Sequence, residues 1–264
     1  MPRGKRFIKA HMRFAYERRL LSHHEQPRVS VWKIMRPAFN LLAKIARSLG
    51  ARPGESLDAN KERPSSLRGL IVGLGNPGPE HERTRHNLGF MLIGALLRDA
   101  ESKGSARPLS GKKDPYALWR ARFDGNTGEW LLSTPLTFMN RSGDAVQRIA
   151  AYYHIPPRNI LVLHDELDLP LGRMKLKQGG GNAGHKGLQS IQRMLGTPDF
   201  YRLRLGIGKP QGYDSASYVL SRFSPDEQDT LSKILDSAVQ GAILFARGEE
   251  RAAQQFCNGF SLEP

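Results

Sequence analysis

The sequence of 264 residues contains one cysteine and no long apolar run, and both absences limit what the protein can be. Cys257 cannot form an internal disulfide, which fits a reducing compartment, and we interpret it as a small apolar residue. No uncharged run approaches the ~20 residues that cross a bilayer, so we predict no membrane span.

Compact motifs for metal binding and for covalent catalysis are also missing. No HExxH or similar spacing occurs, although scattered side chains could bind a metal: His81, His86, His164, Asp165, Glu166 and His185. We therefore predict no metal and no cofactor. No serine or cysteine motif for a covalent intermediate is present either.

Acidic residues are scarce at the start of the chain. Residues 1–68 hold 16 Lys and Arg against 5 Asp and Glu, whereas the remainder holds 24 against 20. A polar stretch with Pro, Gly and Ser from Arg52 to Ser66 indicates a linker. We predict a basic extension at residues 1–66, disordered or partly helical, and one domain at 67–264.

The role of this extension has several interpretations. An Arg-rich, acid-poor amphipathic segment could be an organellar transit segment, a membrane-surface helix or a disordered tail. We expect a cytoplasmic protein, with mitochondria or plastids as the alternative if residues 1–66 are a transit segment.

Short apolar runs alternate with helical patterns in the remainder, which predicts an α/β domain with a mixed twisted sheet flanked by helices. The first strand begins at Leu70. Further strands are predicted at 116–123 and 130–134, joined as a hairpin, and at 160–163, 173–177 and 202–207. Helices are predicted at 88–100, 142–153 and 188–195, and a long helix at 225–247 closes the domain.

The loop after the first strand spells G-x-G-x-x-G at residues 73–78, the motif of dinucleotide-binding folds. In such folds a helix begins at the last glycine, but Pro77 and Pro79 bracket it here and keep the chain extended. We therefore do not expect a dinucleotide site. The loop instead delivers Asn76 to the strand end, with His86 further along.

Two later segments place polar side chains where strands end. Asn140, in Thr-Phe-Met-Asn-Arg-Ser-Gly at 137–143, offers both a donor and an acceptor, and Ser142 is a candidate N-cap. Asp165 follows the strand at 160–163. A carboxylate at this place is suited to accept a hydrogen bond from a histidine ring and to fix its tautomer.

A third segment combines alternate lysines with a glycine-rich loop. Lys175 and Lys177 are predicted to share one strand face, and five glycines follow before the helix at 188 begins. This pattern favours phosphate binding, with a plain flexible loop as the alternative.

Taken together, these segments resemble the bacterial-type peptidyl-tRNA hydrolase family. The matching motifs are Gly-Asn-Pro-Gly at 75–78, Thr-Arg-His-Asn at 84–87, Thr-Phe-Met-Asn at 137–140, His-Asp-Glu-Leu-Asp-Leu-Pro at 164–170 and the glycine-rich loop leading to Gly184 and His185. The resemblance covers about residues 67–250. It implies an enzyme that hydrolyses the ester joining a peptide to tRNA, and nothing in the sequence demands more than a monomer.

The resemblance also implies roles for individual residues. The catalytic set is His86, Asp165 and Asn76, and the set that binds substrate or tRNA is His81, Phe138, Met139, Asn140, His185 and Lys186, to which the strand pattern adds Lys175 and Lys177. Two positions depart from the family. Lys186 stands where asparagine is common, and His81 stands where tyrosine is usual.

A non-catalytic protein is the alternative, because the same scaffold serves as an RNA-binding protein in plant organelle splicing factors that resemble this family. The basic extension keeps this alternative open. The intact Asn76, His86, Asn140 and Asp165 favour an enzyme.

Overall fold

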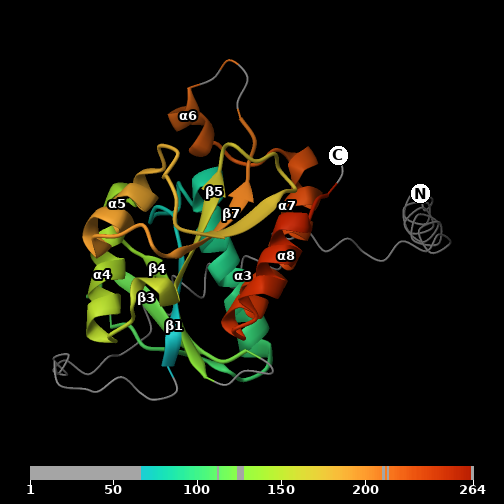
Figure 1. Cartoon of the computed structure of the whole chain (residues 1–264). Coiled ribbons are helices and arrows are strands. Elements are labelled where there is room, and N and C mark those ends of the chain that lie inside the picture. The colour runs from blue at the N-terminus through green and yellow to red at the C-terminus, as the bar shows by residue number, and fades with distance from the viewer. Residues whose placement is uncertain (1–66, 112, 124–127, 210–211, 213, 263–264) are drawn as a thin grey trace, which may run out of the picture. The chain divides into compact units, whose positions relative to one another are not determined.

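A seven-stranded mixed sheet organises the part of the chain that the computed structural model describes, residues 67–111, 113–123, 128–209, 212 and 214–262 (Figure 1). Its strand order is β2-β3-β4-β1-β5-β7-β6. The predicted extension and the tip of the predicted hairpin, residues 124–127, lie outside the described residues.

The four central strands are parallel, so their carboxyl ends meet at one edge of the sheet. β1 pairs in parallel with β4 and β5, and β5 pairs in parallel with β7. Antiparallel pairs, β2 with β3, β3 with β4, and β6 with β7, complete the sheet. The strands are β1 Leu67–Gly73, β2 Ala106–Pro108, β3 Tyr116–Ala121, β4 Glu129–Pro135, β5 Ile160–Glu166, β6 Met174–Gln178 and β7 Tyr201–Gly206.

Helices cover both faces of the sheet, because the central strands are apolar on both sides. On β5, Leu161 and Leu163 pack into a core with α3 Leu88–Ser102, α7 Gln228–Ala246 and α8 Glu250–Gly259. The alternate residues Ile160 and Val162 pack with α4 Ser142–Tyr152 and α5 Lys186–Leu195. Figure 1 shows the two groups on opposite sides of the sheet. Shorter elements are η2 Arg85–Asn87, η3 Met139–Arg141, η4 Pro157–Asn159, η5 Pro225–Glu227 and α6 Ser215–Val219.

The predicted fold class and element order are confirmed, with three corrections. The helix predicted to close the chain is followed by α8, and β2 and α6 were not predicted. Ser142 is not an N-cap, because it is the first residue of α4 and its hydroxyl donates to the Met139 carbonyl at 2.9 Å. Of the described helices, none is both long and apolar enough to cross a membrane.

Close packing of backbone on backbone brings η2 beside the end of β5. A Cβ added to Gly89, at the start of α3, would lie 2.3 Å from the Leu163 carbonyl oxygen and 2.4 Å from the Leu74 nitrogen. Glycine is therefore required at this contact. The adjacent Phe90 N–H donates to the Leu74 carbonyl at 3.2 Å, and the Leu74 N–H donates to Leu163 at 2.9 Å.

Candidate active site

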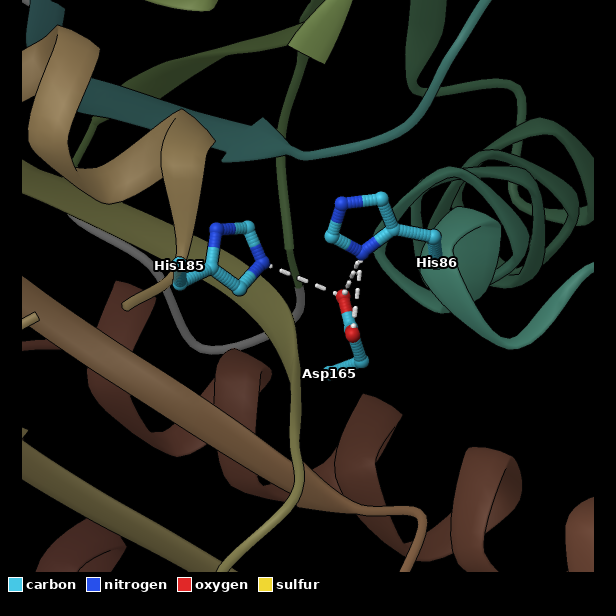
Figure 2. A group of neighbouring side chains, drawn as sticks. All are labelled: His86, Asp165 and His185. Atoms are coloured by element: carbon cyan, nitrogen blue, oxygen red, sulfur yellow. Dashed lines mark hydrogen bonds and ion pairs between the residues drawn. The ribbon is translucent and has the colours of Figure 1, made fainter. Parts of the chain in front are cut away.

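His86, Asp165 and His185 meet at the carboxyl edge of the sheet, although they come from three distant segments (Figure 2). His86 lies in η2, Asp165 lies near the end of β5, and His185 directly precedes α5. His86 Nδ1 is 3.0 Å from each carboxylate oxygen of Asp165. Because an ionised carboxylate only accepts, the proton of His86 lies on Nδ1, and Nε2, which points away from Asp165, keeps its lone pair.

The Asp165 carboxyl is almost completely buried and yet ionised. Burial acts to raise its pKa, but the charges and hydrogen bonds of His86 and His185 outweigh burial and hold the pKa well below its usual range. A permanent carboxylate at this position can stabilise an imidazolium on His86 whenever that ring takes up a proton.

His185 binds the Asp165 carboxylate with one ring nitrogen and the start of α5 with the other. Its Nε2–H donates to Asp165 Oδ1 at 3.1 Å, while its Nδ1 accepts from the backbone N–H groups of Gly187 and Leu188 at 3.2 and 3.4 Å. The imidazole is therefore the N-cap of α5 and a second donor to the carboxylate. Both nitrogens have protein partners, and the His185 ring lies 4.9 Å from the His86 ring.

Asn76 is fixed by three hydrogen bonds, and its amide NH₂ group has no hydrogen-bond partner among the described residues. Its backbone N–H donates to Asn87 Oδ1 at 2.8 Å, and its carbonyl accepts from Asn87 Nδ2 at 2.9 Å. Its side-chain oxygen accepts from the Met139 N–H at 2.8 Å. Asn76 thus presents donors, not acceptors, to the space beside His86.

A cavity of about 710 Å³, which we call the large cavity, opens beside these residues. Its lining comes from the end of β5 and from the segments that follow β1, β4, β5, β6 and β7, at the carboxyl edge of the parallel strands, where α/β folds place their ligands. Eight of the predicted site residues line it: Asn76, His86, Phe138, Met139, Asn140, Asp165, His185 and Lys186.

Three predicted residues do not line the large cavity. His81 lies with its Nε2 3.7 Å from a carboxylate oxygen of Glu80. Lys175 is exposed on β6, and Lys177 lines a separate hollow on the α5 side of the sheet.

This second hollow, the small cavity, measures about 180 Å³. Its lining residues are His164, Glu166, Lys177, Gly181, Ala183, Leu188, Arg202 and Arg204. The antiparallel register places Lys175 opposite Arg204 and Lys177 opposite Arg202, so four cations share one face. Sequence reasoning missed the two arginines, because only strand pairing shows that alternate residues of β6 and β7 lie together.

Several polar atoms of the small cavity have no partner within the part of the chain that the structure describes. The Arg202 Nη1 donates to the Gly181 carbonyl at 2.6 Å, but its Nε and Nη2 have no hydrogen-bond partner. His164 Nδ1 donates to the Asp165 carbonyl at 2.7 Å, and its Nε2 is also unpartnered. Burial, together with His185 nearby, lowers the pKa of His164 to about 3, so the ring is neutral and Nε2 is an acceptor.

The donor atoms of His86, Asp165 and His185 lie within 4.8 Å of one another, so these three residues could hold a metal ion. Hydrogen bonds already use the facing nitrogens of both rings to satisfy the carboxylate. Hydrogen bonds therefore hold the three side chains together, and the lone pair of His86 Nε2 points away from Asp165.

The mixed sheet and the histidine–carboxylate pair at its carboxyl edge place the chain among the α/β enzymes. The sequence model of the family described as peptidyl-tRNA hydrolase matches residues 70–263. The chain belongs to this family.

Individual relatives align with this chain over almost their whole length. The peptidyl-tRNA hydrolase of Nitratidesulfovibrio vulgaris (strain Miyazaki F) is 56% identical over 198 residues, which cover 74% of this chain and 98% of the relative. That of Oleidesulfovibrio alaskensis is 54% identical over 200 residues, 75% of this chain and 100% of the relative. The crystal structure of the enzyme from Acinetobacter baumannii matches with a TM-score of 0.67 at 35% identity, covering 75% of this chain and 99% of that one.

Proposed function

We propose that this enzyme hydrolyses the ester bond of peptidyl-tRNA by direct attack of water, with His86 as the general base. Family membership carries the activity and the substrate class. The observation that supports the mechanism is the pair formed by His86 and the buried Asp165, which leaves His86 Nε2 free beside the large cavity.

In the first step His86 Nε2 takes a proton from water while the water oxygen bonds to the ester carbonyl carbon. Asp165 stabilises the imidazolium that forms, because its carboxylate already accepts the Nδ1 proton. In the second step the bond from carbon to the ribose oxygen breaks, and the imidazolium returns its proton to that oxygen. The products are tRNA with a free hydroxyl and a peptide carboxylic acid, which releases its remaining proton to solvent to become the carboxylate.

Asn76 is suited to stabilise the negative oxygen that develops between these steps. Its NH₂ group is the part of the side chain that the protein leaves unused, and hydrogen-bond donors aimed at a developing oxyanion lower the barrier. Asn140 and the Phe138–Met139 pair would hold the peptide end. Phe138 is 62% exposed at the cavity, which leaves its ring accessible to an apolar side chain or a base.

The small cavity is proposed to bind tRNA backbone phosphate, with Lys177 in its lining and Lys175 next along β6, opposite Arg204. Unpaired guanidinium donors and a lysine inside one hollow are the groups that phosphate oxygens accept from. Arg202 and Arg204 join the predicted lysines in this proposal. Lys186, exposed at the start of α5, and His81 remain proposed contacts to substrate or tRNA.

The test is release of peptide from peptidyl-tRNA by the purified protein and by His86→Ala. A general base contributes roughly 10²–10⁴ in rate, so we expect the variant to lose at least two orders of magnitude in turnover while it stays folded. His154→Gly, which replaces an exposed histidine at the end of α4, is the matched control and should keep full activity. Substantial hydrolysis by His86→Ala would refute the assignment of the base.

The proposal extends to the organisation of the chain. A domain at 67–264 with a separate extension at 1–66 is supported by the family match at 70–263 and by relatives covered to 98–100% of their length. A chain beginning at Leu67 should therefore hydrolyse peptidyl-tRNA as the full chain does. We also infer a cytoplasmic monomer, to be checked by sedimentation and by cell fractionation. Among the described residues, no feature favours the non-catalytic alternative.

A further inference from the structure

Arg85, the residue directly before His86, is buried, and its two terminal nitrogens and its planar faces contact one segment of the chain, whereas its Nε has no hydrogen-bond partner among the described residues. Its Nη2 donates to both carboxylate oxygens of Glu227 at 2.8 and 2.7 Å, and its Nη1 donates to the Arg222 carbonyl. The guanidinium also stacks on two rings, with its carbon 4.5 Å from the centre of the Tyr218 ring and 4.8 Å from that of Phe223.

These partners all belong to one continuous segment, residues 218–227, which begins at the border of the large cavity. Val219 and Leu220 line the cavity, as do three residues at the start of α6: Asp214, Ser215 and Ala216. We call these five residues the cavity wall. Tyr218, between its two parts, contacts Arg85 through its ring and donates its hydroxyl to the Ile207 carbonyl at 2.6 Å.

The backbone makes the same connection. The Arg85 N–H donates to the Ser221 carbonyl at 2.9 Å, and Thr84 forms an antiparallel bridge with Arg222. The turn that carries His86 is thus joined to the segment behind the cavity wall by backbone and by side chain.

We propose that Arg85 is a positioning residue for substrate binding, which holds the cavity wall at its working distance from His86. This inference rests on the proposed function, since it concerns the same cavity. It adds a specific division of labour: Arg85 sets the affinity for peptidyl-tRNA, whereas His86 and Asp165 set the chemical rate.

The division follows from what holds each part in place. His86 is fixed by Asp165, and Asn87 is fixed by Asn76, without any contribution from the Arg85 side chain. The segment at 218–223, in contrast, packs its two aromatic rings on the guanidinium. Loss of the Arg85 guanidinium should therefore displace the cavity wall more than it displaces His86.

Arg85→Lys is the informative substitution, because lysine keeps the positive charge but has neither the planar surface nor the fork. A single ammonium cannot hold both Glu227 oxygens and the Arg222 carbonyl while stacking on two rings. We expect KM for peptidyl-tRNA to rise about tenfold and kcat to stay within about threefold of the wild type.

Arg120→Lys is the matched control. Arg120 is another partly buried arginine, and its Nη1 lies 3.3 Å from a Glu129 oxygen at the far side of the sheet, away from both cavities. Its replacement should leave KM and kcat unchanged. Thermal unfolding of both variants, measured beside the kinetics, separates a loss of stability from a change in binding.

Glu227→Gln is the second variant, which tests the same contact if Arg85→Lys does not fold. It weakens the pair from the other side and should raise KM in the same direction, and the double variant should bind no worse than Arg85→Lys alone. An unchanged KM in either single variant, or a fall in kcat with KM unchanged, would overturn the inference. Failure of the proposed function would look different, because the wild type and Arg120→Lys would then release no peptide.

Discussion

The large and the small cavity share the end of β5 but differ in how far protein hydrogen bonds satisfy their polar groups. In the large cavity, the Asp165 carboxylate accepts from two imidazoles, and Asn76 has its oxygen bonded to the backbone. In the small cavity, the Nε and Nη2 donors of Arg202 and the Nε2 acceptor of His164 are buried without a partner among the described residues. We propose that the chemistry in the large cavity uses groups that the protein fixes in place, whereas recognition of a large anion in the small cavity uses donors, such as those of Arg202, that the protein leaves for the ligand.

The alternation of one strand accounts for this contrast. Asp165 points to one side of β5, while His164 and Glu166 point to the other. The two cavities therefore lie at the same edge of the sheet. Glu166 lines both cavities and accepts from Arg204 Nε at 2.8 Å. Substitutions that affect one cavity and spare the other test how separate the two functions are.

Asp165→Asn should break the fixed geometry of the large cavity with the largest effect. An asparagine offers one acceptor oxygen where two rings now donate, and it cannot stabilise an imidazolium as a carboxylate does. We expect kcat for peptidyl-tRNA to fall by about 10²-fold or more, while tRNA affinity, measured by filter binding, stays near the wild-type value. Equal losses in kcat and in tRNA affinity would show that the two cavities do not act separately.

Exchange of Lys175 and Lys177 for alanine should weaken tRNA binding and leave the chemical step unchanged. Each phosphate contact contributes roughly 0.7–0.9 to the slope of log affinity against log salt, so the double variant should bind tRNA more weakly and with a flatter salt dependence. Hydrolysis of a minimal substrate lacking most of the tRNA should change little. Lys233→Ala, an exposed lysine paired with Asp229 on α7, is the control. An unchanged salt slope in the double variant would assign both lysines to the solvated surface.

Low pH should lower the free energy of unfolding through Asp165, which lines the large cavity. The pKa of Asp165 is depressed in the folded state by His86 and His185 against the effect of burial, so its pairing stabilises the fold above the unfolded pKa of about 4. That contribution is lost as pH falls below this value, because the unfolded chain then takes up the proton more readily. Urea unfolding at pH 7 and pH 3.5 should show wild type losing more free energy of unfolding than Asp165→Asn does. Parallel losses would contradict this account.

The smallest expected effect lies outside both cavities and provides a baseline for the others. His154 follows α4 with φ at +52°, in the left-handed region that favours glycine, and the Ile155 N–H closes the helix end on the Ala150 carbonyl at 2.8 Å. His154→Gly should raise the free energy of unfolding by about 1 kcal/mol in chemical denaturation and leave kcat and KM unchanged. Destabilisation by this change would mean that the histidine side chain makes a contribution of its own.

Much of the fold could be predicted from local patterns, because apolar runs, turn residues and helical periodicity are local properties. The strand at 160–163 and the helices at 88–100 and 142–153 lie within two residues of the observed elements at most of their ends. β5 extends further, to Glu166, since polar residues at a strand's end do not carry an apolar pattern. The short α6 was missed because none of its residues is buried, and α8 was missed although it buries Ala253 and Cys257 at helical spacing.

Site residues were predictable as motifs but not as contacts. Proximity of His86 to Asp165 is anticipated by the family resemblance, whereas Arg202 and Arg204 depend on strand register. Likewise, no local pattern in the sequence indicates that Arg85 reaches Glu227, 142 positions away. Contacts of this kind are set by tertiary packing, which a single sequence encodes only through the whole fold.

The double use of His185 has a consequence for how substitutions in this enzyme are interpreted. One imidazole caps a helix and donates to the carboxylate that we propose to be catalytic, so its removal should both fray the helix end and loosen the proposed reaction centre. A kinetic loss in such a variant is therefore a composite quantity. Amide-exchange protection at Gly187 and Leu188 provides the means to divide it, because those two N–H groups report the helix end alone.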